Sequence, residues 1–183
     1  MPNVPNTISL FRLLLVPLVV YLLAISAYGY ALAVFLTASV SDGIDGWIAR
    51  HYDLRTAIGA ILDPVADKLV ILACLLMLTW HALIPLWLTL SLLARDLIIV
   101  VGAMAYRRLT GHLQVTPTLL GKIHIFMEFG MLCLVLADAA GIVSLSLQWL
   151  FMLVLATAVL SGLHYVWIWT RKAARFLAGK SQT

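Results

Sequence analysis

Charged residues are scarce in this chain of 183 residues. Asp, Glu, Lys and Arg together make up only 11% of it, whereas about a quarter is usual in a soluble domain. No linker, low-complexity run or internal repeat separates its apolar stretches. Because a membrane-spanning helix needs roughly 20 apolar residues, the 63% of hydrophobic residues indicates a polytopic membrane protein with a single domain over 1–183. An ordinary soluble enzyme is excluded.

Cysteine and targeting signals are equally sparse. Cys74 and Cys133 lie within apolar runs, without CxxC or His-rich neighbours, so we expect small packing residues and neither a disulfide nor metal ligands. No small-residue cleavage site follows the first apolar stretch, and no Arg/Ser-rich transit sequence precedes it. We therefore expect a retained first helix, and a bacterial inner (plasma) membrane in preference to an organelle.

The apolar stretches predict an all-α integral membrane fold with six transmembrane helices. The expected spans are 8–27, 31–50, 59–79, 83–107, 118–137 and 145–170. Lys and Arg are absent from the first, third and fifth connections, and they occur in the second, in the fourth and after the last span. The positive-inside rule then predicts that both termini are cytoplasmic. A net charge of +4 distributed in this way favours anionic lipid over nucleic acid as a partner.

Acidic residues are rare, yet four of the eight fall at Asp42, Asp45, Asp63 and Asp67. The first pair lies near the predicted cytoplasmic end of the second helix, and the second pair lies early in the third. Spacings of three and four residues place each pair on one helix face. At about 1.5 Å per residue, Asp42 and Asp67 each lie roughly 12 Å from their helix ends. We therefore expect the two pairs to face each other at one depth.

Four carboxylates in a site of low dielectric constant require protons or cations. Oxygen ligands favour Mg²⁺, Mn²⁺ or Ca²⁺ over zinc, and four of them suit two ions that clamp a transferring phosphoryl group. One alternative is a set of structural salt bridges with Arg50, Arg55 and Lys68. A divalent-cation or proton carrier and a membrane scaffold are others, but a carrier would show repeat symmetry or broken helices around a midplane site. The sequence shows neither pattern.

These aspartates belong to a longer pattern, Asp-x2-Asp-Gly-x2-Ala-Arg-x8-Gly-x3-Asp-x3-Asp, which resembles the signature of the CDP-alcohol phosphatidyltransferases. The segments "PNTISLFRLLLVP" and "DPVADK" resemble the phosphatidylglycerophosphate synthases and cardiolipin synthases of that superfamily. The signature extends over 26 residues, and its eight fixed positions are Asp42, Asp45, Gly46, Ala49, Arg50, Gly59, Asp63 and Asp67.

The resemblance implies a reaction and a site. The four aspartates would hold two divalent cations, Mg²⁺ or Mn²⁺, and Asp67 would also be the catalytic base on the acceptor hydroxyl. Gly46, Arg50, Thr56 and Gly59 would bind the CDP portion of CDP-diacylglycerol. The phosphatidyl group would pass to an alcohol with release of CMP. The resemblance also implies a homodimer whose site opens to the cytoplasm.

The alcohol acceptor is the least determined partner. Arg95, Lys122 and His124 are candidate acceptor-binding residues because they are polar and lie within or near predicted spans. Structural alternatives exist for each: Arg95 can pair with Asp96, His124 with Glu128, and Lys122 can extend to the membrane interface. Both interpretations stay open on the sequence alone.

The fourth and fifth helices distinguish two branches of the family. Phosphatidylglycerophosphate synthases usually carry an Arg-Glu pair in the fourth helix and a Gly-Lys-x-Lys-Thr stretch entering the fifth. This chain has Arg95–Asp96 and "PTLLGKIHIFMEF", so that His124 replaces the second lysine and Ile125 the threonine. The difference moves weight toward phosphatidylglycerol as acceptor, but glycerol 3-phosphate stays open beside it, and inositol phosphate or serine are further alternatives.

Overall fold

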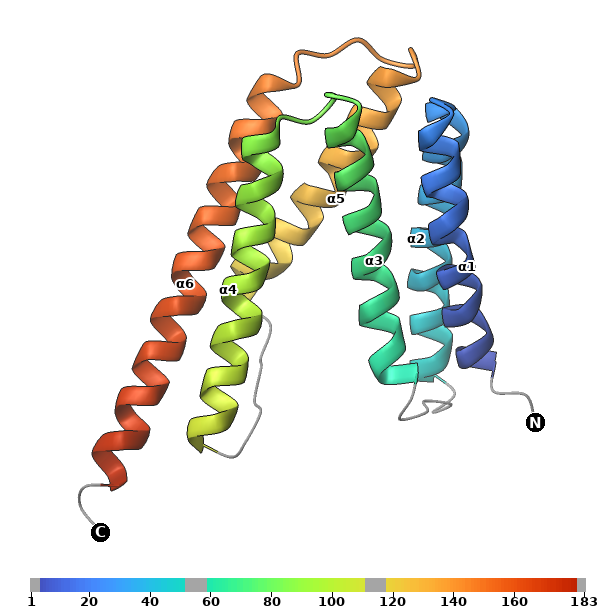
Figure 1. Ribbon diagram of the computed structural model, residues 1–183. Helices are drawn as coiled ribbons and strands as arrows, with labels where there is room; N and C mark the ends of the chain where they lie inside the picture. Colours follow the sequence, from blue (N-terminus) through green and yellow to red (C-terminus); the bar gives the residue numbers. More distant parts are fainter. Residues whose placement is uncertain (1–3, 52–58, 111–117, 181–183) are drawn as a thin grey trace. The chain divides into compact units, whose positions relative to one another are not determined.

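A computed structural model describes residues 4–51, 59–110 and 118–180, with side chains described for 14–39, 68–108 and 118–172. The described residues form the six expected helices (Figure 1), which confirms the all-α prediction. The helices are α1 (Val4–Ala24), α2 (Tyr28–His51), α3 (Gly59–Trp80), α4 (Leu86–Thr110), α5 (Leu119–Ala139) and α6 (Gln148–Lys180).

The last helix is longer than the sequence pattern predicted. The expected span ended at 170, where the apolar run stops, but α6 continues to Lys180. The added segment "RKAARFLAGK" consists largely of Ala, Arg, Lys and Leu, which are strong helix formers. A span ends where hydrophobicity ends, whereas a helix ends only where backbone propensity or a cap ends it.

Three helices contain an apolar segment long enough to cross a membrane: Leu86–Arg108, Leu119–Ala139 and Gln148–Lys172. In the first three helices, the apolar segments found among described residues are shorter, and they are Leu14–Ala24, Tyr28–Ser39 and Lys68–Trp80. Large apolar side chains cover the outside of α4 and α6, as expected of a surface that faces lipid. The helices therefore fit a membrane protein, and the count of six spans and the orientation of the termini stay predictions.

Three of the helices end in the same tight turn. Ser26 after α1, Ala82 after α3 and Gly141 after α5 have φ angles of 56°, 58° and 72°. After α1, the Ala27 N–H donates to the Leu22 carbonyl at 2.8 Å. This is the hydrogen bond of a Schellman cap that spans six residues. Equivalent bonds close α3 and α5. These caps satisfy carbonyls that would otherwise lack partners at the helix ends, and they allow the chain to reverse within a few residues.

The chain divides into two compact units. The first contains α1, α2, α3 and the C-terminal part of α5 from Leu132. Within it, α1 packs against both α2 and α3, and its core includes the fully buried Leu23 and Phe35. Cys74 and Cys133 also lie in this unit, and both are free thiols, as predicted.

The second unit contains α4, α6 and α5 up to Met131. Within it, α4 packs against α6, and Leu88, Leu92 and Val154 are almost fully buried. A Cβ on Gly162 of α6 would lie 3.6 Å from Cγ of Arg95, in ordinary van der Waals contact. The Arg95 side chain of α4 therefore lies directly against the backbone of α6.

Candidate active site

The signature aspartates occupy continuous α-helix, as the sequence predicted. Asp42 and Asp45 lie in the C-terminal half of α2, and Asp63 and Asp67 lie in the first half of α3. The end of α2 and the start of α3 lie at the same end of the first unit (Figure 1). With 3.6 residues per turn, each pair occupies one face of its helix. The four side chains are outside the described ones, so their meeting in one cluster stays a prediction.

The positions assigned to the donor extend this arrangement. Gly46 and Arg50 follow Asp42 on α2 at intervals of four residues, so these three positions lie along one helix face. Gly59 is the first residue of α3. Thr56 is outside the described residues. Three of the four donor positions therefore lie on α2 or α3, the two helices that carry the aspartate pairs.

Arg95 is enclosed in the packing of α4 against α6. Its side chain is 8% exposed. Nη1 donates to Oδ1 of Asp96 at 2.8 Å, and Nη2 donates to Oγ of Ser161 at 2.9 Å. The guanidinium carbon lies 6.0 Å from the ring centroid of Tyr165, at the outer limit of a cation–π contact. The charge is thus compensated by an ion pair and a hydroxyl within the second unit.

His124 is also buried, with 1% exposure. Its Nδ1 lies 3.1 Å from Oγ1 of Thr157, and that hydroxyl donates to the Val154 carbonyl at 2.8 Å. Because the single hydroxyl proton is used in this way, Nδ1 must be the donor to Thr157. Nε2 lies 3.6 Å from Oε2 of Glu128. With Nδ1 protonated, this contact is attractive only when a second proton resides on Nε2 or on the carboxyl group.

The three candidate acceptor residues do not share one environment. Arg95 and His124 contact α6 at Ser161 and Thr157, whereas the side chain of Lys122 is exposed. Lys122 and His124 lie two residues apart and hence about 200° apart around α5. The pairs Arg95–Asp96 and His124–Glu128, which the sequence offered as structural alternatives, are both present. Acceptor binding by these residues stays a prediction.

Tyr165 connects the start of α5 to this polar cluster. The Gly121 N–H donates to Oγ1 of Thr118 at 3.1 Å, so Thr118 caps the N-terminus of α5. The Thr118 N–H in turn donates to the Tyr165 hydroxyl at 3.2 Å. A Cβ on Gly121 would lie 2.9 Å from that hydroxyl. A side chain at position 121 would therefore require the end of the Tyr165 side chain to shift.

The α6 residues that contact Arg95, His124 and the start of α5 were not predicted from the sequence. Thr157, Ser161, Tyr165 and Trp169 recur at intervals of four, so they lie on one face of the helix. Each contacts a residue of α4 or of the first part of α5. The sequence pattern that could have identified them is a polar or aromatic residue at every fourth position along a largely apolar segment.

Comparisons with known proteins give a consistent result. A sequence profile for CDP-alcohol phosphatidyltransferase matches residues 2–176. The chain is 38% identical to a cardiolipin synthase (CMP-forming) of Streptomyces coelicolor over 76% of this chain and 67% of that protein. It is 30% identical to a probable phosphatidylglycerophosphate synthase of Mycobacterium tuberculosis over 99% of this chain and 86% of that protein.

A human cardiolipin synthase (CMP-forming) is 37% identical over 66% of this chain, which corresponds to 39% of the human protein. The profile match includes both aspartate pairs and extends over all six helices. The resemblance carried by the signature in α2 and α3 is therefore confirmed over nearly the full length. The chain belongs to the CDP-alcohol phosphatidyltransferase family.

Proposed function

We propose that this enzyme transfers the phosphatidyl group of CDP-diacylglycerol to a hydroxyl of a glycerol-type alcohol and releases CMP. The observation that carries the proposal is the complete aspartate signature on α2 and α3, within a family match over residues 2–176. Relatives at 38% and 37% identity are CMP-forming cardiolipin synthases. The enzyme would act in an inner membrane as a homodimer, with its site open to the cytoplasm.

Two divalent cations, Mg²⁺ or Mn²⁺, would be held by Asp42, Asp45, Asp63 and Asp67. The residues fit such a group because they supply two pairs of hard oxygen ligands, each on one face of a continuous helix. When bound, the cations would neutralise the donor pyrophosphate and the departing CMP. Among the residues whose side chains are described, which do not include these four aspartates, no group of three or more His, Cys, Asp or Glu could hold a metal ion.

The protein residues supply positioning and proton transfer. Gly46 leaves space for the nucleotide beside the α2 backbone, Arg50 pairs with a donor phosphate, and Thr56 and Gly59 complete the donor site. The Asp67 carboxylate takes the proton of the acceptor hydroxyl. That oxygen bonds to the phosphorus that carries diacylglycerol, while the bond from this phosphorus to the CMP oxygen breaks. In-line attack of this kind depends mainly on positioning and charge neutralisation.

For the acceptor, we favour phosphatidylglycerol, which would give cardiolipin. His124 replaces a lysine of the phosphatidylglycerophosphate synthase pattern, and it is buried against Thr157. The Streptomyces relative is a cardiolipin synthase. Glycerol 3-phosphate is the second candidate, because the mycobacterial relative aligned over 99% of the chain is a probable phosphatidylglycerophosphate synthase.

The test is acceptor-dependent CMP release by the purified full chain in mixed micelles with CDP-diacylglycerol and Mg²⁺. Phosphatidylglycerol and glycerol 3-phosphate are supplied in separate reactions. Asp67→Asn should lower the rate by roughly 10²–10⁴-fold, the usual contribution of a general base. Asp53→Asn is the matched control, because Asp53 is a neighbouring acid outside the signature. Absence of CMP release with any alcohol would contradict the proposal, and the acceptor that supports release identifies the product.

A further inference from the structure

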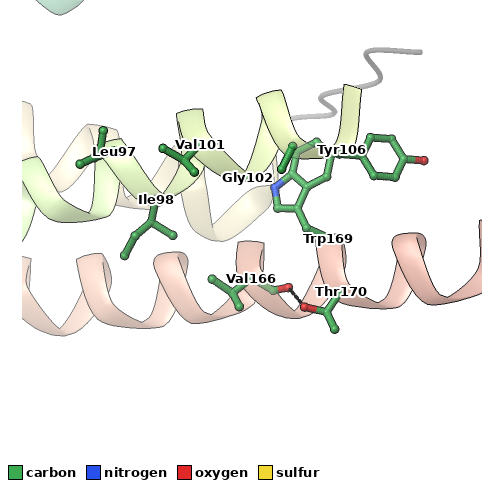
Figure 2. A pocket seen from close by; sticks show the side chains of 9 residues that line it. Leu97, Ile98, Val101, Gly102, Tyr106, Val166, Trp169 and Thr170 are labelled. Atoms are coloured by element: carbon green, nitrogen blue, oxygen red, sulfur yellow. Dashed lines mark hydrogen bonds between the residues drawn. The ribbon is translucent and has the colours of Figure 1, made fainter. Parts of the chain in front are cut away.

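The second unit carries an apolar groove between α4 and α6 (Figure 2). Its volume is about 490 Å³, within the range of about 300–1,000 Å³ that small-molecule sites occupy. Its lining includes Ile98, Val101, Gly102, Tyr106, Val166 and Trp169. The groove belongs to neither the aspartate signature nor the Arg95 and His124 contacts.

Gly102 and Trp169 form the floor of the groove. A Cβ on Gly102 would lie 3.4 Å from Cδ1 of Trp169, and Figure 2 shows the nitrogen edge of the indole turned toward Gly102. The indole ring is 9% exposed and lies 4.9 Å from the Tyr106 ring, centroid to centroid. Its Nε1 has no hydrogen-bond partner among the described residues. Val101, which lines the side of the groove on α4, is 54% exposed. The groove thus has a buried aromatic ring at its base and an exposed apolar residue at its side.

Positive charge is concentrated at one end of this groove. Arg107 and Arg108 lie in the last turn of α4, and Arg171 and Lys172 follow the groove residues on α6. The Lys172 Nζ lies 5.9 Å from the centroid of Trp169, and the Arg171 guanidinium lies 4.6 Å from the centroid of the Trp167 ring. Neither residues 97–110 nor the whole of α6 contains Asp or Glu. The charge beside the groove thus has a single sign.

We propose that this groove binds one acyl chain of an anionic phospholipid of the bilayer, with the lipid phosphate at the basic end of the groove, where Lys172 lies beside Trp169 and Arg171 adds positive charge nearby. The apolar walls match a hydrocarbon chain, and the long basic side chains can reach the headgroup level beside it. The site goes beyond the transferase reaction, because none of its residues belongs to the signature.

A second copy of the chain is the competing occupant, and the charge pattern disfavours it. A two-fold contact brings the same patch of both subunits together. Two grooves paired about an axis along α4 and α6 would place four cations opposite four more. Like charges brought together in this way repel each other, whereas a lipid phosphate neutralises them. Complementary charge therefore favours the lipid.

The experiment uses the full chain in phosphatidylcholine vesicles that contain increasing fractions of phosphatidic acid with brominated acyl chains. Phosphatidic acid is anionic and carries no alcohol hydroxyl, so it cannot act as acceptor, and the result does not depend on the proposed reaction. The fluorescence of Trp169 is obtained by subtracting the emission of the Trp169→Phe variant from that of the wild-type protein. Brominated phosphatidylcholine in an otherwise identical series provides the neutral reference.

Quenching of Trp169 should be half complete at a mole fraction of phosphatidic acid at least fivefold below that of phosphatidylcholine, since each basic residue near the surface contributes roughly fivefold. Arg171→Gln combined with Lys172→Gln should remove this preference, and both substitutions lie outside the helix packing. Gly102→Leu, which fills the groove, should abolish the quenching. The matched control is Gly130→Leu on α5, where a Cβ meets no atom within 4 Å.

Equal quenching by the two lipids would overturn the proposal, because it would indicate unselective contact with bilayer lipid. Quenching by neither lipid would also overturn it. In that case, disulfide cross-linking of Val101→Cys between copies, in a background without Cys74 and Cys133, would assign the groove to a second copy of the chain.

Discussion

The two units of this enzyme use polar residues in different ways. In the first, the acids recur at helical spacing along α2 and α3 and match the family signature. In the second, Arg95 and His124 are buried and bonded to Ser161 and Thr157 on α6. A polar residue in such a helix thus has two explanations, a place in the family signature or a bonded place in the helix packing. The surroundings of a side chain and its place in a pattern distinguish the two.

The largest effect should come from the signature. Asp63→Asn removes a charge assigned to the metal site, and we expect a loss of CMP release of roughly 10³-fold or more, as for other groups that stabilise transition-state charge. Thermal unfolding in neutral detergent should change little. Asp138→Asn is a control in the first unit, because Asp138 caps the backbone N–H of Leu145 at 3.0 Å. If Asp63→Asn lowers the unfolding temperature and leaves turnover intact, Asp63 stabilises the fold and does not serve catalysis.

Arg95→Leu tests the other side of the comparison. Removing one partner of a buried ion pair typically costs about 3–5 kcal/mol. We expect a value near the lower end, because Asp96 is 20% exposed. The measurement is thermal unfolding in detergent, with Arg107→Leu, an exposed residue of the same helix, as control. If stability is unchanged and the KM for the acceptor rises, Arg95 is an acceptor ligand and its burial is incidental.

The signature aspartates and Arg95 also show what could be predicted from the sequence. Six helices followed from apolar runs, because hydrophobic length and helix length nearly coincide in membranes. The placement of the two aspartate pairs in α2 and α3 was predicted correctly from the apolar runs, and their meeting in one metal site stays a prediction. The contacts of Arg95 could not be predicted, since Ser161 lies 66 residues away and only packing brings the two together. The extent of α6 to Lys180 was missed for a different reason, because helix propensity, and not hydropathy, determines where the helix ends.

Gly121→Ala should have an intermediate effect. The added methyl group would lie 2.9 Å from the Tyr165 hydroxyl, and overpacking of this kind costs roughly 1–3 kcal/mol. Tyr165→Phe in the same chain removes the hydroxyl and should restore part of the loss. A double-mutant cycle of unfolding free energies measures this coupling. Additive losses would show that Tyr165 is not the residue that excludes a side chain at position 121.

Lys122→Gln should have the smallest effect on stability and gives the sharpest test of acceptor binding. Its side chain is exposed, so the free energy of unfolding should change by no more than about 0.5 kcal/mol. Among the three candidate residues it is the one that the packing against α6 does not enclose. An increase in the KM for glycerol 3-phosphate without an increase for phosphatidylglycerol would indicate that Lys122 contacts the terminal phosphate of glycerol 3-phosphate. If the KM values for both acceptors and the stability stay at their wild-type values, Lys122 only extends to the membrane interface. Acceptor recognition would then have to be sought on α2 and α3, beside the aspartates.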